Sequence, residues 1–209
     1  IMRILYATSM SLEKEKNSGN KIHFVEIGKA LKKMGHDVVL IAPYYSNNGT
    51  KENYGLIDEQ ISLGKKNIFN YLLFHNQLIK KLPALLGKYK PDFFYSRDLK
   101  NVPKINQKLN RKDIFHFVEI NGLIKDSHFK PYFLKKILAN SQKKQINAAD
   151  LIRVMTKEQK EMIIKEFNKN NKQLFVYKFL LTYILATTTT TTTTPLYDTF
   201  LKRIKQQQK

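Results

Sequence analysis

Apolar and polar positions alternate in blocks along this chain, and the period of the alternation changes from block to block. The segment 3–7, which is apolar after Arg3, and the segment 38–42 fit strands that are buried on both faces. Between them, residues 20–34 place apolar side chains at helical spacing, which predicts an amphipathic helix. Gly35 stands where a left-handed helix C-cap belongs, and we expect Pro43 to end the second strand.

The buried stripe expected for that first helix comprises Ile22, Val25, Ile27, Ala30, Leu31 and Met34. Further strands are expected within 56–63 and at 93–95, 114–120 and 151–155, and further helices at 67–88, 98–110, 131–147 and 156–168. Pro83 is expected to kink or divide the helix in which it lies, and Thr156 with Gln159 forms a capping box. The alternation predicts an α/β fold: a single Rossmann-like, doubly wound parallel sheet of five or six strands with helices on both faces.

The pattern stops at about residue 177. An apolar run at 178–186 is followed by eight threonines at 187–194 and a short basic end. A threonine homopolymer has no periodicity that specifies a packed element. We therefore predict one domain over residues 2–177 and a low-complexity, poorly ordered tail over residues 178–209. The threonine tract also suggests slippage during replication, so the hypothesis arises that the tail is read in a shifted frame.

Charge and composition narrow the function. The chain has 37 Lys and Arg against 17 Asp and Glu, a formal net charge of +20, which favours an acidic partner such as an anionic membrane, nucleic acid or a phosphorylated substrate. A solvated, lysine-rich surface accounts for the same charge. There is no cysteine, which excludes disulfides, zinc–thiolate sites and a cysteine nucleophile. Because no signal peptide and no apolar run of about 20 residues is recognisable, we expect a cytoplasmic protein.

Short motifs recur at the predicted strand ends, in the segments 2–8, 18–23, 30–38, 91–97, 118–122 and 149–158. In order and spacing they resemble the amino-terminal domain of family 4 glycosyltransferases, which have the two-lobed GT-B fold. The resemblance implies the acceptor-side half of an enzyme that transfers a sugar from a nucleotide sugar to a lipid-linked or polysaccharide acceptor. It implies no metal and no cofactor besides the nucleotide-sugar substrate. The second GT-B lobe, with most donor contacts, is absent, so we expect the chain alone to be inactive.

The loop after the first strand carries the first candidate site, at Gly19 and Asn20. A glycine at a helix start lets backbone amides approach a phosphate, and the resemblance implies contact with the donor diphosphate. A simple turn glycine is the alternative interpretation. His23 matches a position of the family and is interpreted as structural, and the histidines show no metal-ligand spacing.

A second group of candidates lies at the ends of two later strands. The resemblance implies acceptor binding by Arg97, Glu119, Asn121 and Gly122, with Asn121 and Glu119 as weak catalytic candidates. Arg97 has the guanidinium geometry to hold a phosphate or carboxylate, and a carboxylate such as Glu119 acts as a base when its pKa is tuned. The alternatives are a surface ion pair of Arg97 with Asp98 or Glu119, a structural role for Glu119 as the partner of a Lys or Arg within the fold, and a turn role for Gly122.

The third candidate site is an aromatic and basic stretch, Lys130, Tyr132, Phe133, Lys135 and Lys136, which we interpret as a membrane surface at the inner membrane face. An ordinary packing helix is the alternative. Two other functions remain open: a non-catalytic module that binds a glycan, an anionic lipid or a separate donor-binding lobe, and a nucleic-acid binder. No nucleic-acid partner is expected, because no recognised motif for one occurs.

Overall fold

The computed structural model describes residues 1–9, 19–45, 57–63, 68–97, 99, 102–110, 114–123, 132–167 and 174–176. The chain divides into two compact units, Ile1–Tyr177 and Lys178–Lys209, and every described residue belongs to the first. The predictions made for the tail, for Asp98 and for Lys130 therefore lie outside the described residues.

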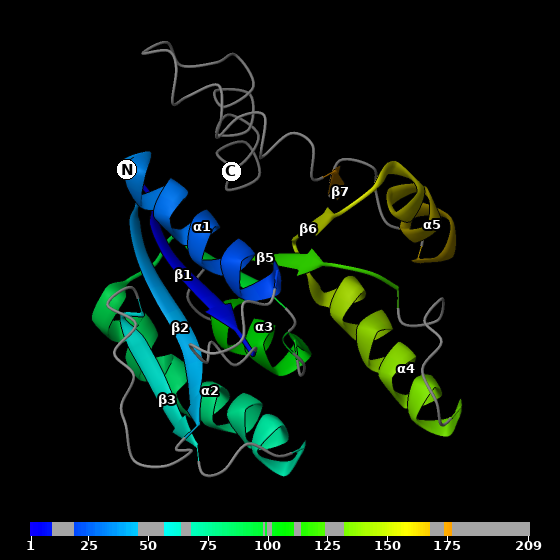
Figure 1. Cartoon of the computed structure of the whole chain (residues 1–209), viewed down its shortest axis with the longest axis horizontal. Coiled ribbons are helices and arrows are strands. Elements are labelled where there is room, and N and C mark those ends of the chain that lie inside the picture. Colours follow the sequence, from blue (N-terminus) through cyan, green and yellow to red (C-terminus); the bar gives the residue numbers. More distant parts are fainter. Residues whose placement is uncertain are drawn as a thin grey trace. The chain divides into compact units, whose positions relative to one another are not determined.

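Seven parallel strands form one sheet in the order β3-β2-β1-β4-β5-β6-β7 within the described part of the chain (Figure 1). Their bounds are β1 Arg3–Thr8, β2 Asp37–Tyr45, β3 Glu59–Leu63, β4 Phe93–Arg97, β5 Phe115–Ile120, β6 Leu151–Val154 and β7 Leu174–Val176. The doubly wound parallel sheet expected from the alternation is confirmed. The additional strand is β7, which pairs with β6.

Five described helices cover the two faces of the sheet. They are α1 Gly19–Lys33, α2 Ile68–Tyr89, α3 Val102–Asn110, α4 Tyr132–Ala148 and α5 Lys157–Phe167. Helix α1 lies on one face, and α2 and α3 lie on the other (Figure 1). Leucines and isoleucines of α2 and α3 pack on β1, β2 and β4 in one buried cluster, and α3, α4 and α5 share a second with β5 and β6. Helices on both faces are therefore also confirmed.

Three aspartates fix the register of the strands at the amino edge of the sheet. Asp58, Asp92 and Asp150 each precede a strand. In each case one residue of the neighbouring strand donates its backbone N–H to the aspartate carboxylate at 2.8 Å. The backbone carbonyl of that residue accepts a hydrogen bond from the aspartate's own N–H. A parallel ladder that is fixed at one edge places its carboxyl ends in a defined order, which matters for the site described below.

Two proline predictions were wrong in part. Strand β2 continues through Pro43 to Tyr45, because the pairing with β1 ends at Ile41 and only β3 adjoins β2 at the proline. Helix α2 is not divided by Pro83 but runs from Ile68 to Tyr89. Its buried face extends on both sides of the proline, so packing on the sheet offsets the cost of about 3 kcal/mol.

The buried face of α1 is rotated from the predicted stripe. Phe24 and Ile27 are buried, whereas Ile22 is 52% exposed. A Cβ on Gly28 would come within 2.8 Å of the Leu40 side chain, so glycine permits close packing of α1 on β2. The predicted cap is confirmed, since Gly35 has a φ of 81°. The backbone N–H groups of Gly35 and His36 donate hydrogen bonds to carbonyls in the last turn of α1.

Candidate functional site

The order of the strands reverses between β1 and β4, since β1 has β2 on one side and β4 on the other. In open α/β sheets ligands bind outside the carboxyl ends of the strands at such a switch point. Thr8 and Arg97 are register partners at these two strand ends, and both are buried. The candidate site is therefore the carboxyl edge of β1, β4 and β5.

A row of charged side chains crosses the sheet next to this edge. Arg97 on β4 is the register partner of Glu119 on β5, which in turn is the register partner of Arg153 on β6. One carboxylate oxygen of Glu119 lies 3.3 Å from Nη1 of Arg97, and the other lies 3.0 Å from Nη1 of Arg153. All three residues are at most 2% exposed. The ion pair that we considered for Arg97 therefore exists, but it is buried rather than on the surface.

Two further residues complete what we call the Glu119 cluster, which comprises Glu119, Arg97, Arg153, His23 and Tyr95. Nε2 of His23 on α1 lies 3.1 Å from the same carboxylate oxygen that Arg97 contacts. The Tyr95 hydroxyl donates to the other oxygen and accepts a hydrogen bond of 2.8 Å from Arg153. The carboxylate thus joins α1, β4, β5 and β6.

The electrostatics of the cluster keep Glu119 ionised. Burial acts to raise the pKa of the Glu119 carboxyl, but the hydrogen bond from His23 and the charges of Arg153 and Arg97 outweigh it and bring the pKa to about 2. Burial, with the nearby charge of Glu119, raises the pKa of Tyr95 well above its usual value. A general base near neutral pH needs a pKa near the working pH. These properties favour the structural interpretation of Glu119 over a role as a base.

The residues after β5 form a corner that we call the β5 corner, Asn121 to Leu123. Asn121 is half-buried, Gly122 is exposed, and the Leu123 side chain is buried in the cluster shared by α4 and α5. Gln142 of α4 donates to the carbonyl of Gly122 at 2.7 Å, and Gln159 of α5 donates to that of Asn121 at 3.4 Å. The acceptor-binding roles of Asn121 and Gly122 stay predictions, now with a defined location.

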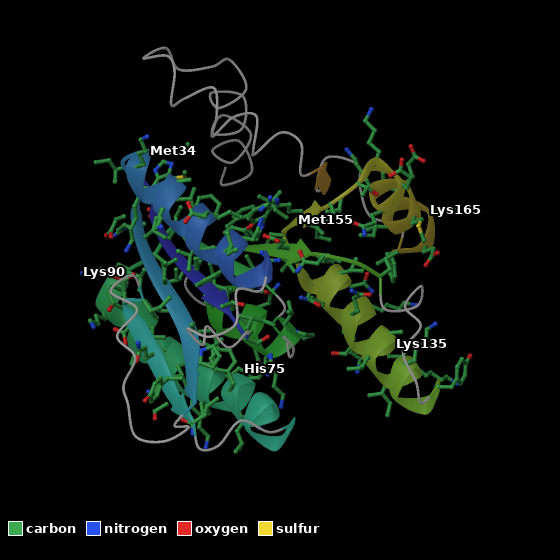
Figure 2. All side chains as sticks on the ribbon, viewed as in Figure 1. Met34, His75, Lys90, Lys135, Met155 and Lys165 are labelled. Atoms are coloured by element: carbon green, nitrogen blue, oxygen red, sulfur yellow. The ribbon has the colours of Figure 1, made fainter. Side chains whose placement is uncertain are left out.

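The other predicted site residues are placed as follows. Gly19 is the first residue of α1, and the side chain of Asn20 lies outside the described residues. Tyr132 begins α4 and is 78% exposed, and Lys136 on the same helix is exposed. Lys135 is half-buried on this helix, and Figure 2 labels its position. The Phe133 side chain is outside the described part of the chain. None of these placements tests a role.

Sequence reasoning did not single out two members of the Glu119 cluster, Arg153 and Tyr95. An arginine inside the apolar strand Leu151–Val154 is a signal that could have found Arg153, since such a charge needs a partner. His23 was named and interpreted as structural, but its partner was not predictable. Glu119 is 96 residues away, and only the tertiary structure brings the two side chains together.

A second buried polar network lies on the opposite face of the sheet. Ser96 Oγ is 2.7 Å from Nε2 of His116, whose Nδ1 contacts the side-chain oxygen of Asn106, and Asn106 donates to the carbonyl of Ala148. The sequence of contacts resembles that of a serine hydrolase triad. All three side chains are at most 7% exposed, and they link β4 and β5 to α3 and α4. We assign the network a structural role.

Among the residues that the structure describes, no group of three or more His, Cys, Asp or Glu side chains could hold a metal ion. No helix of the described chain has both the length and the apolar character needed to cross a membrane. Neither finding assigns a function.

Solved structures share this fold. UDP-GlcNAc 2-epimerase from Methanocaldococcus jannaschii is 18% identical to this chain, with a TM-score of 0.57, over 84% of this chain and 45% of that one. Sucrose-phosphate synthase from Thermosynechococcus elongatus is 12% identical, with a TM-score of 0.59, over 83% and 47%. Anabaena Alr3699/HepE, solved in complex with UDP, is 12% identical, with a TM-score of 0.51, over 84% and 43%.

This chain has the fold of one Rossmann-like lobe, as found in GT-B glycosyltransferases and in UDP-GlcNAc 2-epimerases. It spans less than half the length of these solved structures. No protein-family model and no curated protein matches the chain. Membership of family 4 therefore stays a prediction.

The buried histidine generates a prediction for pH dependence. Burial lowers the pKa of His116 to about 3, so the unfolded chain binds a proton below about pH 6.5 that the folded chain does not bind until about pH 3. Stability must fall as pH falls through this window. As the pH falls from 6 to 4, we expect the free energy of unfolding of the wild-type chain to decrease by about 1.4 kcal/mol per pH unit more than that of His116→Gln. Urea unfolding of both chains at several pH values measures it, and parallel curves would contradict the assignment of a neutral His116.

Proposed function

We propose that this chain is the acceptor-side part of a glycosyltransferase that uses a nucleotide sugar, with a lipid-linked or polysaccharide acceptor. The observation that carries the proposal is the likeness in fold, over more than four fifths of this chain, to glycosyltransferases and nucleotide-sugar epimerases. Low sequence identity limits that likeness to the fold. Two of these structures contain UDP, which supports a nucleotide-sugar ligand for the wider group.

The carboxyl edge supplies the residues that the proposal needs. The start of α1 at Gly19 can direct backbone amides at a phosphate, and the β5 corner brings the half-buried Asn121 and the exposed Gly122 to the same edge as candidate contacts of the acceptor. In this account Arg97 and Glu119 support the edge, since both are buried in one ion-pair cluster. The alternative is a non-catalytic module that uses the same edge to bind a glycan. It predicts the same glycan binding but no sugar transfer, whether the chain is alone or bound to a partner protein.

A binding experiment on the whole chain tests the proposal. We expect methyl glycosides of glucose, galactose, mannose or N-acetylglucosamine to bind in the millimolar range. We expect UDP to bind no more tightly, since this chain spans less than half the length of the solved structures that share its fold. Saturation-transfer NMR with each ligand measures both. We also expect neither transfer from UDP-sugars nor C2 epimerisation of UDP-GlcNAc by the chain alone. Micromolar UDP binding without glycan binding, or C2 epimerisation, would contradict the proposal. Sugar transfer would contradict only the expectation that the chain alone is inactive.

We further propose that the first turns of α4 contact an anionic membrane. Helix α4 contains four lysines and no acidic residue. Tyr132 is 78% exposed and Ile137 is 60% exposed. Lys135 and Lys136 stand between them in the sequence of this helix. Exposed apolar side chains next to lysines are typical of helices that lie in the membrane interface. The surface fits a lipid-linked acceptor, which would be presented at the membrane.

Charge reversal tests the membrane proposal. The double variant Lys135→Glu/Lys136→Glu should lose about 2 kcal/mol or more of binding to phosphatidylglycerol vesicles, since each lysine near such a surface contributes about 1 kcal/mol. The matched control is Lys143→Glu/Lys144→Glu, further along the same helix. Co-sedimentation at low salt measures both, with phosphatidylcholine vesicles as the uncharged comparison. Equal losses in the two variants would indicate general charge attraction rather than contact by this turn.

A further inference from the structure

Three neighbouring helices carry lysines and no acidic residue. Helix α2 contains three lysines, α3 contains two and α4 contains four, and none of these helices contains an aspartate or a glutamate. By contrast, α5 contains three lysines and three glutamates. A large share of the chain's net charge of +20 therefore lies on α2, α3 and α4.

These three helices lie side by side on one face of the sheet. Helix α3 contacts both α2 and α4 and lies between them (Figure 1). Phe94 of β4 belongs to the buried cluster of α2 and α3, and Val118 of β5 belongs to the buried cluster of α3 and α4. Phe94 and Val118 are on the same face, because His116, the register partner of Phe94, is two residues from Val118. The exposed sides of the three helices therefore form one outer surface.

Six lysines form a band across this surface, which we call the lysine face. It comprises Lys80, Lys81, Lys104, Lys108, Lys143 and Lys144. All are exposed except Lys108, which is half-buried. Each lies within the last ten residues of its helix, which is a length of about 15 Å. Neighbouring helices pack with their axes about 8–10 Å apart, so the band extends about 16–20 Å from α2 to α4.

The lysine face has no acidic counterpart among the residues that the structure describes. Elsewhere on the domain several basic side chains are paired with carboxylates, in the pairs Arg3–Asp92, Lys32–Asp58 and Lys88–Glu59. No lysine of the lysine face makes an ion pair with a described acidic side chain. Because a surface of one sign attracts ions of the opposite sign, this face is complementary to a polyanion.

The lysine face differs from the first turns of α4 in its exposed side chains. Among the described residues of α2, α3 and α4, the exposed large apolar side chains are Leu73, Tyr132 and Ile137, and each lies in the first six residues of its helix. The exposed residues beside the lysines include the amides of Gln107 and Asn140. A helix that lies in a membrane interface needs an exposed apolar side. The lysine face lacks one in its described part, which favours a polyanion in water over a lipid surface.

We propose that the lysine face binds the phosphate backbone of a duplex nucleic acid, without regard to base sequence. This interaction goes beyond the proposed function. Lysines and side-chain amides are common phosphate contacts, and a duplex carries one negative charge per about 1.7 Å of its axis, so a band of this size faces several phosphates. The described part of the face exposes no aromatic side chain on which unpaired bases could stack.

The absence of a recognised motif led us to expect no nucleic-acid partner. Contacts with phosphates need no motif, because they require only positive charge at the right places. The lysines that supply this charge come from three helices, and only the fold brings them to one surface.

The salt dependence of binding tests the lysine face. The whole chain should bind a 20-base-pair DNA duplex with a dissociation constant of about 10⁻⁴–10⁻⁶ M at physiological salt. The logarithm of the association constant should fall with the logarithm of the NaCl concentration with a slope of about −5, since each lysine that neutralises a phosphate contributes about −0.9. Fluorescence anisotropy measures both. A duplex of unrelated sequence should bind equally well and a single strand more weakly, and tighter binding of the single strand would overturn the proposal.

Removing one lysine from each helix tests whether the three helices act together. Lys80→Gln/Lys104→Gln/Lys143→Gln should make the slope shallower by about 3 and should lower the affinity for the duplex at least tenfold. The urea midpoint of unfolding should not change, because all three side chains are exposed. The matched control is Lys157→Gln/Lys160→Gln/Lys165→Gln, which removes the same charge from α5 and should change the slope by less than about 1. Equal effects of the two variants would indicate general charge attraction and overturn the proposal.

Two other polyanions distinguish a nucleic acid from other occupants of this face. The variant with one lysine removed from each helix should co-sediment with phosphatidylglycerol vesicles as the wild-type chain does. If it loses vesicle binding and keeps duplex binding, the face is a membrane surface and the proposal is overturned. Polyglutamate at an equal concentration of charge should not displace the duplex, and displacement would point instead to an acidic protein partner. The proposed function does not depend on these results, because it is tested by glycan binding.

Discussion

The carboxyl edge of this sheet depends on one buried carboxylate. Glu119 lies between Arg97 and Arg153 in a row that crosses three adjacent strands, and His23 brings α1 to the same group. Burying any one of these charges without a partner costs several kcal/mol, whereas together they are satisfied. The arrangement fixes the relative positions of the strand ends and of the helix that follows the first strand, and the candidate ligand contacts come from these elements.

The two edges of the sheet are held by different means. At the amino edge, Asp58, Asp92 and Asp150 make the same pair of hydrogen bonds. The carboxylate and the backbone N–H of each aspartate are both hydrogen-bonded to one residue of the next strand. At the carboxyl edge, the Glu119 cluster and the glutamines around the β5 corner join strand ends to the helices α1, α4 and α5. Polar and charged side chains therefore gather at the edge where ligands bind in folds of this kind.

Much of the fold followed from local pattern, because strands buried on both faces and amphipathic helices have different periods. Gly35 and the Thr156–Gln159 box were predictable for the same reason, since each acts within a few residues. Pro43 and Pro83 were misjudged because the number of neighbouring strands and the burial of α2 decide their effect, and neither is a local property.

The candidate site was less predictable. The positions of Arg97, Glu119 and Asn121 at strand ends could be predicted, but the burial of the first two could not. Arg153 and His23 become meaningful only when strands and helix meet around Glu119. The glutamines of the β5 corner carry no motif that predicts their contact with carbonyls on another element. Sequence pattern thus located the edge, while tertiary structure showed which of its residues are buried in the Glu119 cluster.

The most direct test of this account is the stability of Glu119→Gln, measured by urea unfolding at neutral pH beside the matched control Glu26→Gln, which alters a surface pair with Lys29. The account predicts a loss of about 3–5 kcal/mol for Glu119→Gln, because two buried arginines lose their shared counter-charge, and a change of less than about 1 kcal/mol for the control. If the two variants were equally stable, the carboxyl edge would not depend on Glu119, and the account would be contradicted.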